Sequence, residues 1–120
     1  MIILSYDNKI KNVLTFLTSL ASPLRLRIFR LLLENDFCVC ELQRMLKVEQ
    51  SRLSHQLRLL RLAGLIEVRE QRRWSVYSVS PAWKNHPLVA ALKKTLPLEK
   101  AEKSALAAVF EKSLRLRAGD

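Results

Sequence analysis

Apolar residues recur at three- and four-residue steps along much of this chain, which is the spacing of amphipathic helices. The first such segment spans residues 9–20, with apolar positions at Ile10, Val13, Leu14, Leu17 and Leu20. Ser22 and Pro23 follow, a helix-capping residue and a proline suited to the first helical position. We therefore expect a second helix from there to about residue 34.

The second expected helix has one apolar side and several arginines. Its buried side should consist of Leu24, Ile28, Leu31 and Leu32, and its other sides carry Arg25, Arg27 and Arg30. Asn35 and Asp36 then end the helix.

Residues 38–62 have the pattern of a helix-turn-helix motif. A short helix is expected from about Cys38 to Leu46, then a turn at Lys47 and Val48, then a helix from near Gln50 to Leu62. The second helix turns three leucines inward, Leu53, Leu57 and Leu60. Polar and basic residues recur along another of its sides, at Gln50, Ser54, Arg58 and Arg61. Gly64 suits the left-handed conformation that ends helices.

The period changes to that of strands at residues 66–79. Two β-rich runs there are separated by residues 70–73, so we expect a hairpin with a basic tip. Helical patterns resume afterwards, interrupted at Pro87 and Pro97, and a terminal helix is expected at about residues 98–117. The prediction is one domain over residues 1–120, mainly α with a small β-hairpin wing.

Charge indicates the kind of partner. The chain has 21 lysines and arginines against 11 acidic residues, a formal net charge of +10 at pH 7. Such an excess in a small domain favours a polyanion such as nucleic acid, although a merely basic surface has the same composition. No apolar run approaches the ~18 residues of a membrane span, so no membrane association is expected. No export signal is recognised and only two thiols occur, which predicts a cytoplasmic protein.

An enzyme is not expected. The chain has two glycines and no phosphate-cradling loop, and neither histidine has a recognisable nucleophile partner. A non-specific architectural DNA binder stays an alternative to a sequence-specific one.

Three segments together resemble the ArsR/SmtB family of metal-sensing bacterial repressors, across roughly residues 10–80. They read LASPLRLRIFRLLLEN, FCVCELQRML and VEQSRLSHQLRLLRLAGLIEVREQRRWSVYSVS, and CVCEL is similar to the box of the arsenic-responsive members. The resemblance implies a winged helix-turn-helix that binds double-stranded operator DNA. It also implies a homodimer formed through the first and last helices, at about residues 9–20 and 98–117.

The second helix of the motif should carry the DNA contacts. We expect Gln50, Ser51, Ser54 and His55 at the major groove, Arg52 and Arg58 on phosphates or base edges, and Arg72 and Arg73 at the wing tip. The family usually has serine or threonine just before this helix, whereas this chain has Glu49. Ser51 is therefore either a DNA contact or the helix cap.

Cys38 and Cys40 are the only cysteines, and they are open to three interpretations. They are core residues, a redox or reactive-sulfur sensor, or ligands of a metal. The family resemblance and the softness of thiolates favour As(III) or Sb(III) as an inducer that relieves repression, with no organic cofactor. Arsenic-responsive members often have a third cysteine where this chain has Gln43, so the third ligand is unassigned.

A mechanism follows if both cysteines lie on a regular helix. Side chains two positions apart then point about 200° from each other, so one ion reaches both sulfurs only where the first helical turn unwinds or never forms. We expect that unwinding to move the DNA-reading helix.

Overall fold

The computed structural model describes the backbone of residues 2–118 and the side chains of residues 6–109. The ends of the predicted domain, residues 1 and 119–120, and the side chains of residues 110–117 in the predicted terminal dimerisation helix lie outside the described residues. The elements follow in the order α1 (Ile2–Ser19), α2 (Pro23–Leu32), β1 (Phe37–Cys38), α3 (Val39–Leu46), α4 (Gln50–Leu62), β2 (Ile66–Gln71), β3 (Trp74–Val79), α5 (Pro81–Lys84), α6 (Pro87–Thr95) and α7 (Lys100–Ala118).

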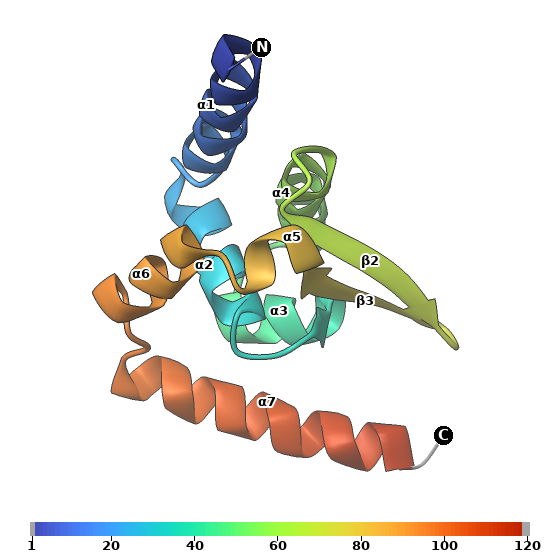
Figure 1. Ribbon diagram of the computed structural model, residues 1–120. Helices are drawn as coiled ribbons and strands as arrows, with labels where there is room; N and C mark the ends of the chain where they lie inside the picture. Colours follow the sequence, from blue (N-terminus) through green and yellow to red (C-terminus); the bar gives the residue numbers. More distant parts are fainter. Residues whose placement is uncertain (1, 119–120) are drawn as a thin grey trace.

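The predicted fold class is confirmed: the chain is mainly helical and has a small antiparallel wing (Figure 1). The wing has three strands rather than the two expected, in the order β1-β3-β2. Strand β1 was not predicted because it has only two residues, Phe37 and Cys38, and pairs with Tyr77 and Val76 on a distant part of the chain.

The core lies where α2, α3 and α4 meet the base of the wing. Its fully buried side chains include Ile28 and Phe29 from α2, Leu42 from α3, and Leu53 and Leu57 from α4. The inward leucines of α4 and the apolar side of α2 were therefore predicted correctly from their spacing.

Arg30 was expected to lie away from the buried side of α2, and this prediction is wrong. Its side chain is buried, where Nε donates a hydrogen bond to the Leu96 carbonyl at 2.7 Å and Nη1 pairs with a Glu34 carboxylate oxygen at 2.9 Å. The burial is tolerated because the guanidinium has these partners. The bond to Leu96 ties α2 to the segment that leads into α7.

Helix α1 is anchored at its C-terminal end and projects away from the rest of the chain (Figure 1). Phe16 stacks on Trp83 with ring centroids 4.5 Å apart and meets Phe29 edge-on at 6.0 Å. Leu20 is also buried in the chain's own core. Among the side chains of α1 that the structure describes, the other large apolar residues are exposed, and they are Tyr6, Ile10, Val13, Leu14 and Leu17.

Helix α7 runs beneath α3 and packs against it (Figure 1). Leu98, just before α7, and Val109, within it, are buried. Within the described part of the chain, no helix is both long and apolar enough to cross a bilayer.

Leu57→Ala should lower the free energy of unfolding by about 2–5 kcal/mol, because Leu57 is fully buried and its truncation leaves a cavity. Leu62→Ala on the same helix is the matched control, since Leu62 is 70% exposed and its loss should change the free energy by less than about 0.5 kcal/mol. Urea unfolding at equal protein concentration measures both, and equal effects would contradict this assignment of the core.

Candidate nucleic-acid interface and thiol site

The exposed side of α4 carries six of the residues predicted to contact DNA. The leucines on the opposite side hold the helix on the core, so the polar side faces solvent. The six residues on that exposed surface are Gln50, Ser51, Arg52, Ser54, His55 and Arg58. Glu49 is the N-cap of α4, and its side chain makes no capping hydrogen bond. Ser51 is the second residue of the helix. Ser51 is therefore not the cap.

Arg25 connects α4 to the anchored end of α1. Its Nη1 donates to the Gln56 side-chain oxygen at 2.9 Å, and its Nε donates to the Ser19 carbonyl at 2.6 Å. A charged donor strengthens both bonds. The position of α4 is thus linked through one side chain to α1, the helix that projects from the body.

Arg72 and Arg73 form the two-residue tip of the wing between β2 and β3, and both are exposed. Arg72 has a φ of 59°, in the left-handed region that favours glycine or asparagine. Tight hairpins need a positive φ at such a position. The chain places a cation there instead of a residue that relieves the strain, at a cost of about 1–2 kcal/mol.

The cysteines do not lie together on a regular helix, and the prediction that their sulfurs diverge is wrong. Cys38 is the N-cap of α3 with extended backbone (φ −83°, ψ 167°), whereas Cys40 is the second residue of the helix. The two sulfurs are 2.9 Å apart. The first turn of α3 need not unwind for one ion to reach both.

Two interactions hold Cys38 in this extended conformation. Its backbone pairs with Val76 in β3, and its N–H donates to the Glu41 carboxylate at 3.0 Å. Cys38 and Glu41 form a capping box, in which the cysteine sulfur faces the Glu41 backbone N–H. The spacing of a capping residue and a glutamate three positions later was visible in the sequence, so this signal was missed.

The two thiols differ in environment. Cys38 is buried and Cys40 is exposed, and both are free. Burial, reinforced by the hydrogen bond with Cys40 and by the neighbouring Glu41 carboxylate, raises the pKa of the Cys38 thiol to about 12. Cys38 therefore keeps its proton at neutral pH.

A groove of about 270 Å³ opens at the thiols and joins parts of the chain that the sequence analysis treated as separate sites. Its lining comes from the start of α3, the start of α4 and the wing: Cys38, Val39, Cys40, Gln43, Gln50, Arg73, Trp74 and Ser75. Two of the predicted DNA-contact residues, Gln50 and Arg73, thus border the thiol pair. Trp74 and Ser75 were missed because only the pairing of β1 with β3 brings the wing beside the cysteines.

The thiols are the metal-binding groups that the described chain offers at this groove. Among the described side chains, no three His, Cys, Asp or Glu residues are grouped closely enough to hold a metal ion. Two soft donors can begin a thiophilic site, but they leave any third bond of a trivalent ion to another molecule.

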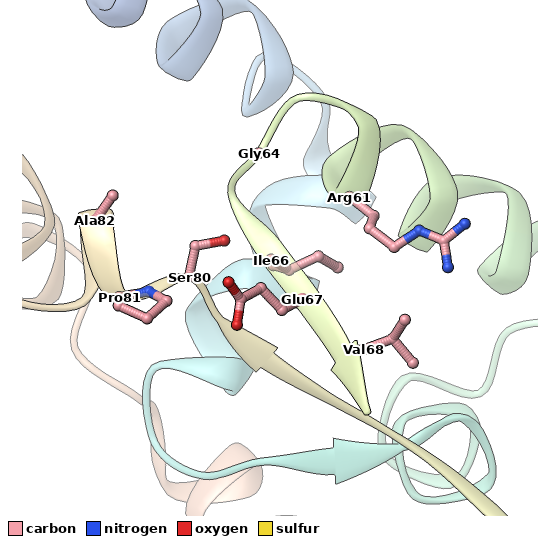
Figure 2. A pocket seen from close by; sticks show the side chains of 8 residues that line it. All are labelled: Arg61, Gly64, Ile66, Glu67, Val68, Ser80, Pro81 and Ala82. Carbon is pink, nitrogen blue, oxygen red and sulfur yellow. The ribbon is translucent and has the colours of Figure 1, made fainter. Parts of the chain in front are cut away.

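A second, open depression of about 730 Å³ lies between the end of α4, β2 and the start of α5 (Figure 2). It is lined by Arg61, Gly64, Ile66, Glu67, Val68, Ser80, Pro81 and Ala82. Figure 2 shows that the charged ends of Arg61 and Glu67 extend in different directions, so they do not converge on one ligand. None of the predicted site residues lines this depression.

Comparison with known proteins places this chain among transcription regulators. Residues 22–68 match the pattern of the family described as bacterial regulatory protein, arsR family. The chain is 34% identical to a biofilm growth-associated repressor of Xylella fastidiosa over 86 residues, which cover 72% of this chain and 75% of that protein. These relatives are regulators, so the prediction that the chain is not an enzyme is confirmed.

Two further relatives match over shorter segments. A transcriptional repressor SmtB homolog of Synechocystis is 42% identical over 65 residues, 54% of this chain and 49% of that protein. The arsenical resistance operon repressor of Escherichia coli is 43% identical over 68 residues, 53% of this chain and 58% of that protein. The chain thus spans about half the length of these two curated relatives.

Solved structures agree with the winged helix-turn-helix fold. Reduced HlyU from Vibrio cholerae superposes with a TM-score of 0.69 at 26% identity, over 78% of this chain and 98% of that one. The transcriptional repressor BigR from Xylella fastidiosa superposes with a TM-score of 0.66 at 29% identity, over 82% of this chain and 100% of that one.

The two thiols should react with iodoacetamide at different rates. At pH 8 we expect Cys40 to be alkylated at least about tenfold faster than Cys38, because Cys38 is buried and its raised pKa keeps it protonated. Quantitative peptide mass spectrometry measures both rates, and in denaturant they should become similar. Equal rates in the folded protein would contradict the described environments.

Proposed function

This chain belongs to the arsR family of bacterial regulatory proteins, and on that premise we propose that it is an arsenite- or antimonite-responsive repressor. It binds operator DNA as a homodimer and is released when the metalloid binds Cys38 and Cys40. One observation supports this function above the others: the two sulfurs lie 2.9 Å apart in a groove that Gln50 and Arg73 also line.

DNA binding is supported by the exposed polar side of α4 and by the charge of the chain. The helix of a helix-turn-helix that follows the turn enters the major groove, and the wing tip reaches the adjacent backbone. The formal charge of +10 becomes +20 in a dimer, so affinity should fall steeply with salt. Gln50 is suited to adenine, and Arg52, Arg58, Arg72 and Arg73 to phosphates or base edges.

The proposed homodimer is supported by the apolar side of α1. Ile10, Leu14 and Leu17 are 41%, 53% and 54% exposed on a helix that projects from the body. A contiguous apolar surface of this kind usually marks an interface. A two-fold dimer through α1 and α7 would also present two copies of α4 to half-sites about one helical turn apart.

The thiol pair fits a trivalent metalloid. At a bond length like the ~2.3 Å of Zn–S and a bond angle of about 90°, a pyramidal ion holds two sulfurs about 3.3 Å apart, so the two sulfurs at 2.9 Å need to separate only slightly to bind it. When As(OH)₃ binds, each thiol loses its proton to a leaving hydroxide, and two waters depart. Coordination thereby removes the Cys38 proton, despite the raised pKa of that thiol.

Release follows from where the metalloid sits. Gln50 begins the DNA-reading helix and Arg73 belongs to the wing tip, so an occupant of the groove contacts both DNA-binding elements. A hundredfold loss of operator affinity requires about 2.7 kcal/mol, which is within the usual range of coupling between two ligands.

A second candidate, a repressor that senses oxidants or reactive sulfur, is favoured by the same short distance between the sulfurs. Hydrogen peroxide would oxidise the two thiols to a disulfide and would itself be reduced to two waters. Among the similar solved structures is HlyU in its reduced form, which also makes this chemistry relevant.

Arg58→Ala should weaken binding to DNA selected by the wild-type protein from a random library by about 1–3 kcal/mol per site, and it should lower the salt dependence. Lys94→Ala on α6 removes the same charge away from the wing and is the control (Figure 1). Fluorescence anisotropy at several salt concentrations measures both variants. If they lose equal affinity, α4 is not the reader.

Cys38→Ser and Cys40→Ser should each preserve DNA binding and abolish release by arsenite. Serine at position 38 is a good helix cap, so α3 should form in that variant. Anisotropy of the selected DNA titrated with arsenite measures release, and Ser75→Ala, which alters the same groove without removing a thiol, should still be released. Release of both cysteine variants would exclude the thiols as the sensor, whereas release of wild type by peroxide alone would favour the second candidate.

A further inference from the structure

We infer that Arg25 is a positioning residue that fixes the spacing between the two operator half-sites which the proposed dimer accepts. This inference rests on the proposed function, because it needs a homodimer that reads DNA through α4. It concerns how far apart the two copies of α4 are held, and not the bases that each copy contacts. Three observations support it: the geometry of one guanidinium, the kind of contact that otherwise holds α1, and the place of Arg25 in its own helix.

The guanidinium of Arg25 spans the gap between α1 and α4. Its Nε donates to the carbonyl of Ser19, the last residue of α1, at 2.6 Å, and its Nη1 donates to the side-chain oxygen of Gln56 in α4 at 2.9 Å. The nitrogen atoms of a guanidinium lie at fixed positions in one plane. Both bonds can therefore form together only over a narrow range of distance and angle between the two helices.

The other contacts that anchor α1 are apolar. Phe16 stacks on Trp83 and meets Phe29 edge-on, and Leu20 is buried in the same core. Burial of apolar surface is a non-directional interaction, so these side chains can stay buried while the helix tilts slightly. Hydrogen bonds weaken steeply as they bend away from a straight line. Among the described contacts of α1, those of Arg25 therefore restrict its angle relative to α4 most closely.

The position of Arg25 within α2 favours this link over the stability of its own helix. Arg25 is the third residue of α2, which begins at Pro23 after the cap Ser22. The first turn of a helix has a partial positive charge, so an acidic residue is preferred there and a cation is disfavoured. The first turn of α2 has no acidic residue. The cation at this position is explained by the two acceptors that it joins.

A small change of angle at Ser19 becomes a large displacement at the proposed dimer interface. Ile10, on the exposed apolar side of α1, lies about two and a half helical turns before Ser19, or ~13 Å at ~1.5 Å per residue. A tilt of ~10° would move Ile10 by ~2 Å relative to α4, and a two-fold axis doubles that displacement. The result is comparable to the ~3.4 Å rise of one base pair.

Loss of the link should leave the reading of each single half-site unchanged. Arg25 and Gln56 are partly buried, whereas the residues proposed to contact bases, among them Ser54 and His55, are exposed. We therefore expect the preference for one spacing to weaken without a loss of affinity for one half-site. A role in fold stability alone would instead lower the affinity for single and paired half-sites alike.

Half-sites taken from DNA that the wild-type protein selects from a random library provide the test. They are placed at the selected spacing and at spacings one and two base pairs shorter or longer. Fluorescence anisotropy measures binding to each duplex and to a duplex with one half-site. We expect the wild type to bind the selected spacing at least about tenfold more tightly than its neighbours, which corresponds to about 1.4 kcal/mol.

Arg25→Lys should reduce this preference to within about threefold, because lysine keeps the charge but lacks the planar fork that reaches both acceptors. Arg27→Lys is the matched control, since Arg27 is exposed on the same helix, and it should keep the wild-type preference. All variants should bind a single half-site within about twofold of wild type, and circular dichroism checks that they fold.

Gln56→Met tests the same link from the α4 side. It removes the acceptor and keeps a good helix former, so it should weaken the spacing preference as Arg25→Lys does. Combining the two substitutions should have little further effect, because either one already removes the shared bond.

The failures are distinguishable. A preference that persists in Arg25→Lys and Gln56→Met, additive effects in the double variant, or a parallel loss of affinity for single and paired half-sites would overturn the role of Arg25 and leave the proposed function standing. Selected DNA without two related half-sites, or a wild type that binds one half-site as tightly as two, would overturn the proposed homodimeric binding as well.

Discussion

The extended backbone of Cys38 is the constraint on which the thiol site depends. The residue belongs to two elements at once, because it pairs with Val76 in β3 and caps α3 through Glu41. If Cys38 were the first helical residue, its sulfur would diverge from that of Cys40. Strand pairing prevents this and keeps the sulfurs 2.9 Å apart, beside the start of α4 and the wing tip. The thiol site is therefore already assembled in the folded chain.

Because the two sulfurs are already close together, the proposed release from DNA cannot rely on unwinding the start of α3. Disrupting the cap of α3 would cost about 0.5–2 kcal/mol, which is less than the ~2.7 kcal/mol needed for a hundredfold loss of affinity. A ligand that disturbed only the helix start would therefore be a weak inducer. We propose that the rest of the coupling free energy comes from the groove, because Gln50 and Arg73 line it and are also proposed to contact DNA. In the proposed function, occupancy by an inducer and binding to the operator therefore compete for the same side chains.

The parts of the fold that were predictable from sequence depend on local periodicity. The leucines of α4 and the two β-rich runs that form β2 and β3 follow from neighbouring residues, and the structure agrees with both. The thiol geometry depends on pairing between residues 38 and 76, which no local pattern encodes. The burial of Arg30 is likewise not encoded by a local pattern, because its hydrogen-bond partner Leu96 lies 66 residues away. Sequence analysis thus proposed the two cysteines as the site but placed their sulfurs wrongly.

Arg25 links the DNA-binding helix α4 to the proposed dimer interface on α1. The spacing of two recognition helices matters only if each is held firmly relative to the dimer interface. Arg25 donates to the Ser19 carbonyl at the end of α1 and to Gln56 in the middle of α4, so it joins the proposed interface helix to the reader without passing through the thiol groove. Under the proposed function the molecule separates two tasks: Arg25 fixes where α4 lies in the proposed dimer, and the groove controls whether the first turn of α4 and the wing are available to DNA.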